Sequence, residues 1–129
     1  MVQFAYTILY VENVPQSVAF YEKAFNLKRR FLHESHQYAE METGGTTLAF
    51  AVNELAKSNL PEGFRENSLS NPPAGIEIGL AVTDVPAAFS QAVGAGAIAV
   101  TEPKVKPWGQ TVAYVRDLDG ILVEICTSM

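Results

Sequence analysis

Residues 8–27 read ILYVENVPQSVAFYEKAFNL, and residues 79–98 read GLAVTDVPAAFSQAVGAGAI. When the second stretch is laid over the first, the matching positions are Leu9/Leu80, Val11/Val82, Val14/Val85, Pro15/Pro86 and Ala24/Ala95. Each stretch begins with a short apolar strand pattern and continues into a helical pattern directly after a proline. This internal similarity predicts two copies of one strand–helix unit.

The residues in front of each proline predict where the helices begin. Asn13 and Asp84 suit the N-cap position, where a side-chain oxygen accepts a backbone N–H. A proline in the first helical turn loses no hydrogen bond, since its missing N–H has no partner there. Apolar residues then recur with the spacing of one helix face, which predicts helices at about 15–25 and 86–95.

Each predicted helix is followed by three further strand patterns, which gives a βαβββ order in each half. These patterns cover residues 28–33, 37–42 and 46–52 in the first half, and 98–102, 111–116 and 121–127 in the second. Gly44-Gly45 and Asp119-Gly120 suit the turns between the last two strands of each half. The sequence thus predicts one α+β domain over 1–129.

We place the first module at about 3–52, a linker at about 53–74 and the second module at about 75–127. The linker is rich in Asn, Ser, Pro and Gly, and we expect one helical turn near its start, at about 53–58.

Composition limits the classes of partner. The chain has 129 residues, of which 48% are hydrophobic and 18% charged, as in a globular domain. Its net charge of −5 argues against nucleic acid and against an anionic membrane surface. The single cysteine, Cys126, and the start of the sequence lead us to expect a cytoplasmic protein.

Three stretches resemble the vicinal oxygen chelate superfamily of glyoxalases, bleomycin-resistance proteins and extradiol dioxygenases. They are residues 6–27, residues 77–97 (EIGLAVTDVPAAFSQAVGAGA) and residues 108–125 (WGQTVAYVRDLDGILVEI), so the likeness covers essentially the whole chain. The resemblance implies a curved mixed sheet that encloses a cleft, helices on its outer side, and a homodimer. It does not choose a function, because this scaffold carries lyases, isomerases, dioxygenases and noncatalytic drug-binding proteins.

The resemblance also implies four positions that face the cleft and hold the metal in metal-dependent members. The matching residues here are Tyr6, Ala49, Glu77 and Glu124. Transition-metal sites need three or four protein ligands, usually including histidine. Ala49 cannot coordinate a metal, and Tyr6 is a poor ligand at neutral pH. We therefore expect no tightly bound transition metal, while a weakly bound divalent cation on the two carboxylates stays open.

The two glutamates are the candidate catalytic residues. Strand alternation places Glu77 on one face with Gly79 and Ala81, whose small side chains leave room for a ligand. Alternation in the last strand places Glu124 on the same kind of face. A partly desolvated carboxylate has a raised pKa and suits a general base, and two facing carboxylates can share a proton. The alternative is that both only hydrogen-bond within the scaffold.

Four aromatic residues are the candidate ligand-binding residues, namely Tyr6, Tyr10, Phe50 and Trp108. Trp108 follows two prolines and precedes a glycine, so we expect it on a loop, as a stacking wall for a planar ligand. Its alternative role is to pack on the other half or on a partner chain.

The other reactive side chains suggest no site. His33 and His36 lie between two predicted strands of the first half, where we expect solvent-exposed residues. We expect Cys126 to be a small buried thiol.

Two functions remain open at this point. The first is the binding of a small organic molecule in the cleft without a tightly bound metal. The second is a glyoxalase-type lyase or isomerase that uses Glu77 and Glu124 as a base or as ligands of a divalent metal. An extradiol dioxygenase fits worst, because its iron site needs two histidines.

Overall fold

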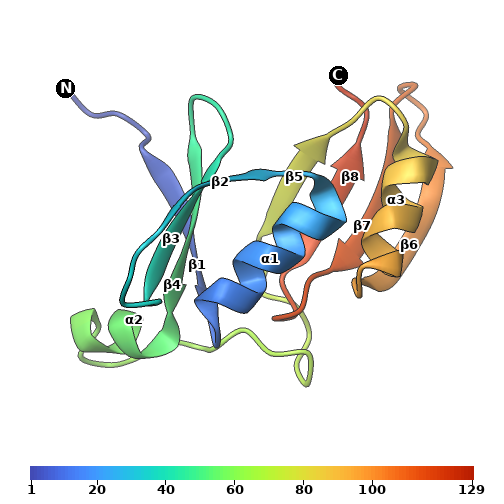
Figure 1. Cartoon of the computed structure of the whole chain (residues 1–129). Helices are drawn as coiled ribbons and strands as arrows, with labels where there is room; N and C mark the ends of the chain where they lie inside the picture. The colour runs from blue at the N-terminus through green and yellow to red at the C-terminus, as the bar shows by residue number, and fades with distance from the viewer. The chain divides into compact units, whose positions relative to one another are not determined.

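The computed structural model describes residues 1–129, which form two compact units. The first consists of Met1–Glu22 and Asn26–Glu66, and the second of Lys23–Phe25 and Asn67–Met129. Each unit contains one four-stranded mixed sheet (Figure 1). The predicted pair of βαβββ modules is confirmed.

The first sheet has the strand order β1-β4-β3-β2. Strand β1 runs parallel to β4, and the other neighbours are antiparallel. The elements of this half are β1 (Tyr6–Val11), α1 (Val14–Phe25), β2 (Lys28–Leu32), β3 (Tyr38–Glu42), β4 (Thr47–Val52) and α2 (Asn53–Asn59). Helix α2 is the helical turn expected at the start of the linker.

The second sheet repeats this topology with the order β5-β8-β7-β6, and β5 is parallel to β8. Its elements are β5 (Glu77–Ala81), α3 (Val85–Gly94), β6 (Ile98–Val105), β7 (Thr111–Arg116) and β8 (Leu122–Cys126).

Both long helices begin as the sequence predicts. The side chain of Asn13 accepts the backbone N–H of Gln16 at 3.0 Å, and that of Asp84 accepts the N–H of Ala87 at 3.0 Å. Each cap satisfies a backbone donor that would otherwise lack an intrahelical partner. Helix α1 ends at Asn26, whose left-handed φ of 58° stops further helical bonding.

Helix α1 contributes the core of the first unit. Val14, Val18 and Tyr21 have no exposed surface, and the ring of Tyr21 lies 5.0 Å from the ring of Phe50 in β4. Edge-on aromatic contacts of this kind add to the stabilisation from burial.

Helix α3 covers one face of the second sheet, with contacts to β6, β7 and β8 (Figure 1). Its fully buried residues are Val85 and Ala92. Phe89 is only half-buried. The buried face of α3 is therefore formed by small side chains.

The turn between β7 and β8 is built around Asp117, which is 1% exposed. Its carboxylate oxygen Oδ1 accepts the backbone N–H of Asp119 at 2.8 Å and of Ile121 at 2.9 Å. Gly120 takes a positive φ of 86° there, which a residue with a Cβ rarely adopts.

Arg116 fastens the linker to this turn. Its guanidinium donates to the carbonyl oxygen of Gly120 at 3.0 Å, of Ser68 at 3.1 Å and of Asn71 at 2.7 Å. Backbone carbonyls therefore take all three of these hydrogen bonds.

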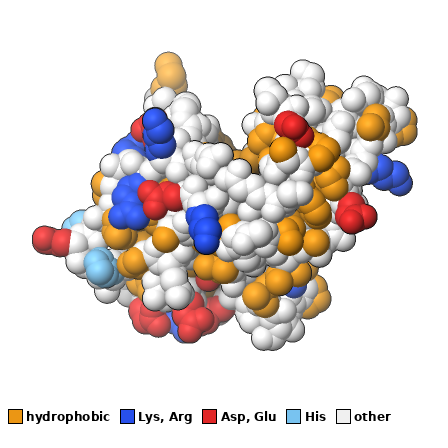
Figure 2. All heavy atoms as spheres, turned by 45° about the vertical axis from the view of Figure 1, so that its right-hand side comes forward, with side chains coloured by type: hydrophobic (Ala, Val, Ile, Leu, Met, Phe, Trp, Pro, Cys, Tyr) orange, Lys and Arg blue, Asp and Glu red, His pale blue; other side chains and the backbone are white.

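The second unit exposes hydrophobic side chains along its edge strand β6. Ile98, Val100 and Val105 are each about half exposed or more. Figure 2 shows hydrophobic side chains exposed among polar ones on the face turned toward the viewer. Pro103 and Lys104 lie in the same strand and oppose pairing with another strand. None of the helices has the length and apolarity needed to cross a membrane.

Candidate functional site

The face of the second sheet that α3 leaves open carries the predicted glutamates. Strand register aligns Gly79 of β5 with Glu124 of β8, and Glu124 in turn with Tyr114 of β7. Glu77 and Gly79 are exposed and alternate with Ile78 and Leu80 of the other face. The two carboxyl groups and the phenol therefore share one surface.

The carboxyl groups of Glu77 and Glu124 are hydrogen-bonded to each other. Partial desolvation raises the pKa of Glu77, and the hydrogen bond to Glu124 and its negative charge raise it further. Two carboxyls in contact can form such a bond only if one of them holds a proton. Glu77 is the one that keeps it to higher pH.

Glu124 has the opposite shift. Partial burial alone would raise its pKa, but the hydrogen bonds from Glu77, Tyr114 and Cys126 and the positive charge of Lys106 outweigh this and lower it. Within this pair, Glu77 therefore keeps a proton to higher pH than Glu124 does.

The hydroxyl of Tyr114 donates to Oε2 of Glu124 at 2.9 Å. Desolvation and this hydrogen bond raise the pKa of Tyr114 to about 12, so the phenol stays protonated at neutral pH. Its hydrogen is committed to Glu124, while its oxygen keeps lone pairs that can accept a hydrogen bond.

Open space lies directly beside this pair. A Cβ added to Gly79 would meet no atom within 4 Å, and Ala81, two residues further along β5, is also exposed. The small side chains predicted in front of the glutamates are therefore present in β5 and leave this surface accessible.

Trp108 lies on the loop between β6 and β7, as its sequence context predicts, and 61% of its surface is exposed. Its indole N–H donates to Oε1 of Gln110 at 2.8 Å, and the Gln110 amide donates to the carbonyl oxygen of Thr127 at 2.8 Å. The indole is therefore anchored at one edge, although its ring surface faces water.

Cys126 is 9% exposed, in agreement with the expected buried thiol. Burial raises its pKa, and the hydrogen bond to Glu124 and that negative charge raise it further. A thiol with a raised pKa is a weak nucleophile at neutral pH.

Two of the predicted aromatic residues lie on the open face of the first sheet. Register aligns Tyr6 with Thr47 and Tyr10 with Ala51, both on the face opposite to α1. Tyr6 is 51% exposed, whereas the ring of Tyr10 lies 4.8 Å from the ring of Phe64. Both belong to the first unit, and their role in binding a ligand stays a prediction.

Phe50 does not lie on an open face, and its assignment as a ligand-binding residue is corrected. It has no exposed surface and contacts Tyr21 of α1. The physical reason is strand alternation: Ala49 points to the open face, so its neighbour Phe50 must point into the core.

The open face of the first sheet also carries a polar network that the sequence analysis missed. Tyr38 donates to Glu40 at 2.8 Å, and Arg30 donates to Glu40 at 3.2 Å, to Glu42 at 2.9 Å and to Thr47 at 3.0 Å. Glu40 is the register partner of Ala49, so the carboxylate on this face comes from β3. Alignment of the repeats at Ala49 alone could not reveal it.

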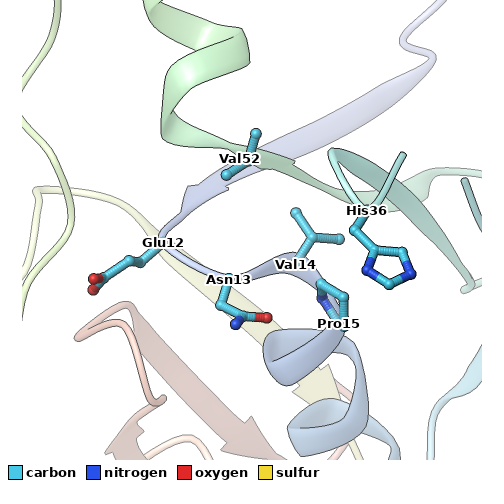
Figure 3. A pocket seen from close by; sticks show the side chains of 6 residues that line it. All are labelled: Glu12, Asn13, Val14, Pro15, His36 and Val52. Carbon is cyan, nitrogen blue, oxygen red and sulfur yellow. The ribbon is translucent and has the colours of Figure 1, made fainter. Parts of the chain in front are cut away.

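Figure 3 shows a separate open pocket of about 360 Å³ in the first unit. Its lining residues are Glu12, Asn13, Val14, Pro15, His36 and Val52. Asn13 is already used as the cap of α1, and the Glu12 side chain points away from the other lining residues (Figure 3). The pocket contains none of the residues predicted for the site.

The residues present do not fit a transition metal. The structure contains no group of three or more His, Cys, Asp or Glu side chains that could hold a metal ion. The Glu77–Glu124 pair supplies two carboxyls, which share a proton, and no imidazole lies with them. This donor set lacks the ligands that iron, nickel or zinc sites use.

Comparison with known proteins gives a consistent picture. Residues 4–129 match the model of the family described as glyoxalase-like domain. No protein with a curated description matches the chain.

Solved structures share the fold at low sequence identity. A glyoxalase-related enzyme from Fulvimarina pelagi is 20% identical, with a TM-score of 0.83 over 99% of this chain and 89% of that one. A glyoxalase/bleomycin resistance protein/dioxygenase family enzyme from Burkholderia phytofirmans is 18% identical, with a TM-score of 0.82 over 99% and 100%. A superfamily member from Sphaerobacter thermophilus is 16% identical, with a TM-score of 0.71 over 99% and 98%.

Proposed function

Since the chain belongs to the glyoxalase-like domain family, we propose that it binds a small organic molecule against the open face of its second sheet. The binding surface is one wall of a sheet-lined cleft and holds no tightly bound transition metal. Glu77, Glu124 and Tyr114 provide the polar contacts, and Trp108 provides an aromatic wall.

The observation that carries this proposal is the Glu77–Glu124 pair beside open space. Charged side chains inside an apolar strand are costly unless they are paired or used. Here two carboxyls with opposite pKa shifts lie next to Gly79, where nothing fills the surface. An anchored but exposed Trp108 on the neighbouring loop supports the same role.

A second candidate, a glyoxalase-type lyase or isomerase, is favoured by the opposite pKa shifts of the pair. In this reaction the Glu124 carboxylate takes a proton from the hydroxyl-bearing carbon next to a carbonyl group. Glu77 gives its proton to the carbonyl oxygen, which yields a neutral enediol. Glu124 then gives its proton to the former carbonyl carbon while Glu77 takes the proton of the other hydroxyl, which completes an isomerisation and restores both carboxyls.

Metal titration and a ligand screen test the proposal. Chelator-treated protein is titrated with nickel, zinc and manganese by calorimetry, and we expect no micromolar binding. Micromolar or tighter binding would contradict the metal-free site. A screen of small molecules by thermal shift and by Trp108 fluorescence should yield ligands whose affinity falls in E77Q, because an amide keeps the shape of the side chain but can neither give up a proton nor carry a charge.

The homodimer and the cytoplasmic location stay proposals. Sedimentation velocity measures the first, and fractionation of the source cells measures the second. If the modules pair across two chains, Tyr6 of one chain faces Glu77 of the other, and a cysteine pair introduced at these positions would crosslink the dimer.

A further inference from the structure

We infer that the ligand carries an ammonium group, which binds between Glu77, Glu124 and the phenol oxygen of Tyr114, and an aromatic ring, which lies against Trp108. This inference rests on the proposed function and specifies its ligand class. It uses the second unit alone.

Hydrogen-bond capacity favours an ammonium group. A primary alkylammonium has three N–H donors and needs acceptors that surround it. Glu124 is a carboxylate, Glu77 presents further carboxyl oxygens, and the oxygen of Tyr114 can accept because its hydrogen goes to Glu124. Three acceptors from three neighbouring strands thus converge on one surface.

The negative charge of the site excludes a ligand that carries an anionic group. An anionic group placed here would meet a carboxylate and a second acid, with Lys106 as the one cation that acts on Glu124. An ammonium group instead gains a charge-assisted hydrogen bond to Glu124, which is about twice as strong as a neutral one. A divalent metal is disfavoured because two carboxyls do not complete its coordination shell.

Two features outside the carboxyl pair point to the same ligand. Trp108 presents an exposed indole face, which attracts a cation or packs on an aromatic ring. The space above Gly79 and Ala81 lets a ligand approach the carboxyls without displacing any side chain.

Three probes with the same ring and different head groups test this assignment. They are 2-phenylethylamine, 2-phenylethanol and 3-phenylpropionate, titrated into the full chain while the fluorescence of Trp108 is followed. Trp108 is the only tryptophan, so the signal reports on this site. We expect the amine to bind about tenfold more tightly than the alcohol, because charged hydrogen bonds are stronger, and the carboxylate to bind most weakly.

Three variants assign the preference to the proposed residues. The double variant E77Q/E124Q should bring the affinity of the amine to that of the alcohol while the alcohol keeps its affinity. Both acids are changed because in E124Q alone Glu77 loses the neighbouring charge that raises its pKa and can itself become the carboxylate. E62Q removes the same charge from an exposed loop residue of the first unit and should keep the preference, which controls for the net charge of −5. G79V should weaken all three probes, because its side chain fills the open space, and its folding is checked by circular dichroism.

The outcomes separate the inference from the function on which it rests. Equal affinity for amine and alcohol, or a preference that survives in E77Q/E124Q, would overturn the ammonium assignment and leave small-molecule binding in place. If none of the probes binds and a wider ligand screen also yields nothing, the proposed function fails as well.

Discussion

Replacing Asp117 by alanine should unfold the protein at a clearly lower urea concentration. The structure gives the reason: Oδ1 of Asp117 accepts two backbone N–H groups, at 2.8 and 2.9 Å, and the residue is 1% exposed. Hydrogen bonds to a charged acceptor contribute about 1.5–3 kcal/mol each. Ile121 is buried, so its N–H loses its partner without gaining water, whereas the N–H of Asp119 can be hydrated. We therefore expect a loss of about 2–4 kcal/mol.

D117N is the matched control, since an amide keeps an acceptor oxygen at nearly the same position and loses only the charge. We expect it to cost about 1 kcal/mol, the difference between charged and neutral hydrogen bonds. Both losses are measured by urea unfolding followed by far-ultraviolet circular dichroism. The comparison requires that the free energy of unfolding falls with urea concentration at the same slope in wild type and variants. A loss below about 1 kcal/mol for D117A, or a larger loss for D117N, would refute the reasoning.

Three further predictions use other parts of the molecule. In the wild type, the pKa of Glu77 is higher in the folded protein than in the unfolded chain. As the pH rises from the usual value of 4.5 to this higher pKa, the unfolded chain releases the proton while the folded protein keeps it, so the stability of the folded protein falls. The free energy of unfolding of E77Q relative to wild type should therefore increase from about pH 4 to about pH 7, and parallel pH profiles would contradict the shared proton. F50A should lower the free energy of unfolding by about 3–5 kcal/mol, because Phe50 is fully buried. F31A, at a residue that is 40% exposed, should lower it by under about 1 kcal/mol. Similar losses for the two variants in chemical denaturation would disprove the core position of Phe50. R116K should destabilise the protein by about 1–2 kcal/mol, because an ammonium cannot reach all three carbonyl oxygens that the guanidinium contacts, and an unchanged urea midpoint would count against this clamp.

The fold was accessible from the sequence because local and long-range signals agree. The repeated strand, cap and proline at Asn13-Val14-Pro15 and Asp84-Val85-Pro86 mark two helices whose starts the structure reproduces within one residue. Turn residues such as Asp119-Gly120 then fix the order of the last two strands. The observed strand ends differ from the predicted ones by a few residues. Strand β6, for example, extends to Val105 because β7 continues to pair with it.

The site was only partly accessible. Alternation placed Glu77, Gly79 and Glu124 correctly, because it depends on sequence position alone. Alternation also excludes Phe50 from the face that carries Ala49, so the assignment of Phe50 as a ligand-binding residue was avoidable. The hydrogen bonds of Tyr114 to Glu124 and of Arg30 to Glu40 were missed for a different reason: each depends on which residue lies nearby in the neighbouring strand, and register is a tertiary property.

The pairs Tyr38–Glu40 and Tyr114–Glu124 show how the two halves of the repeat differ. Glu40 in β3 occupies the register position that Tyr114 holds in β7, and Ala49 occupies that of Glu124. The acid has therefore changed strands between the two copies, while the backbone that carries it has not. In one copy Arg30 neutralises it, so that half can be retained for stability alone. The other copy places two acids in contact on an open face, so under the proposed function the second half recognises the ligand and the first half serves as scaffold.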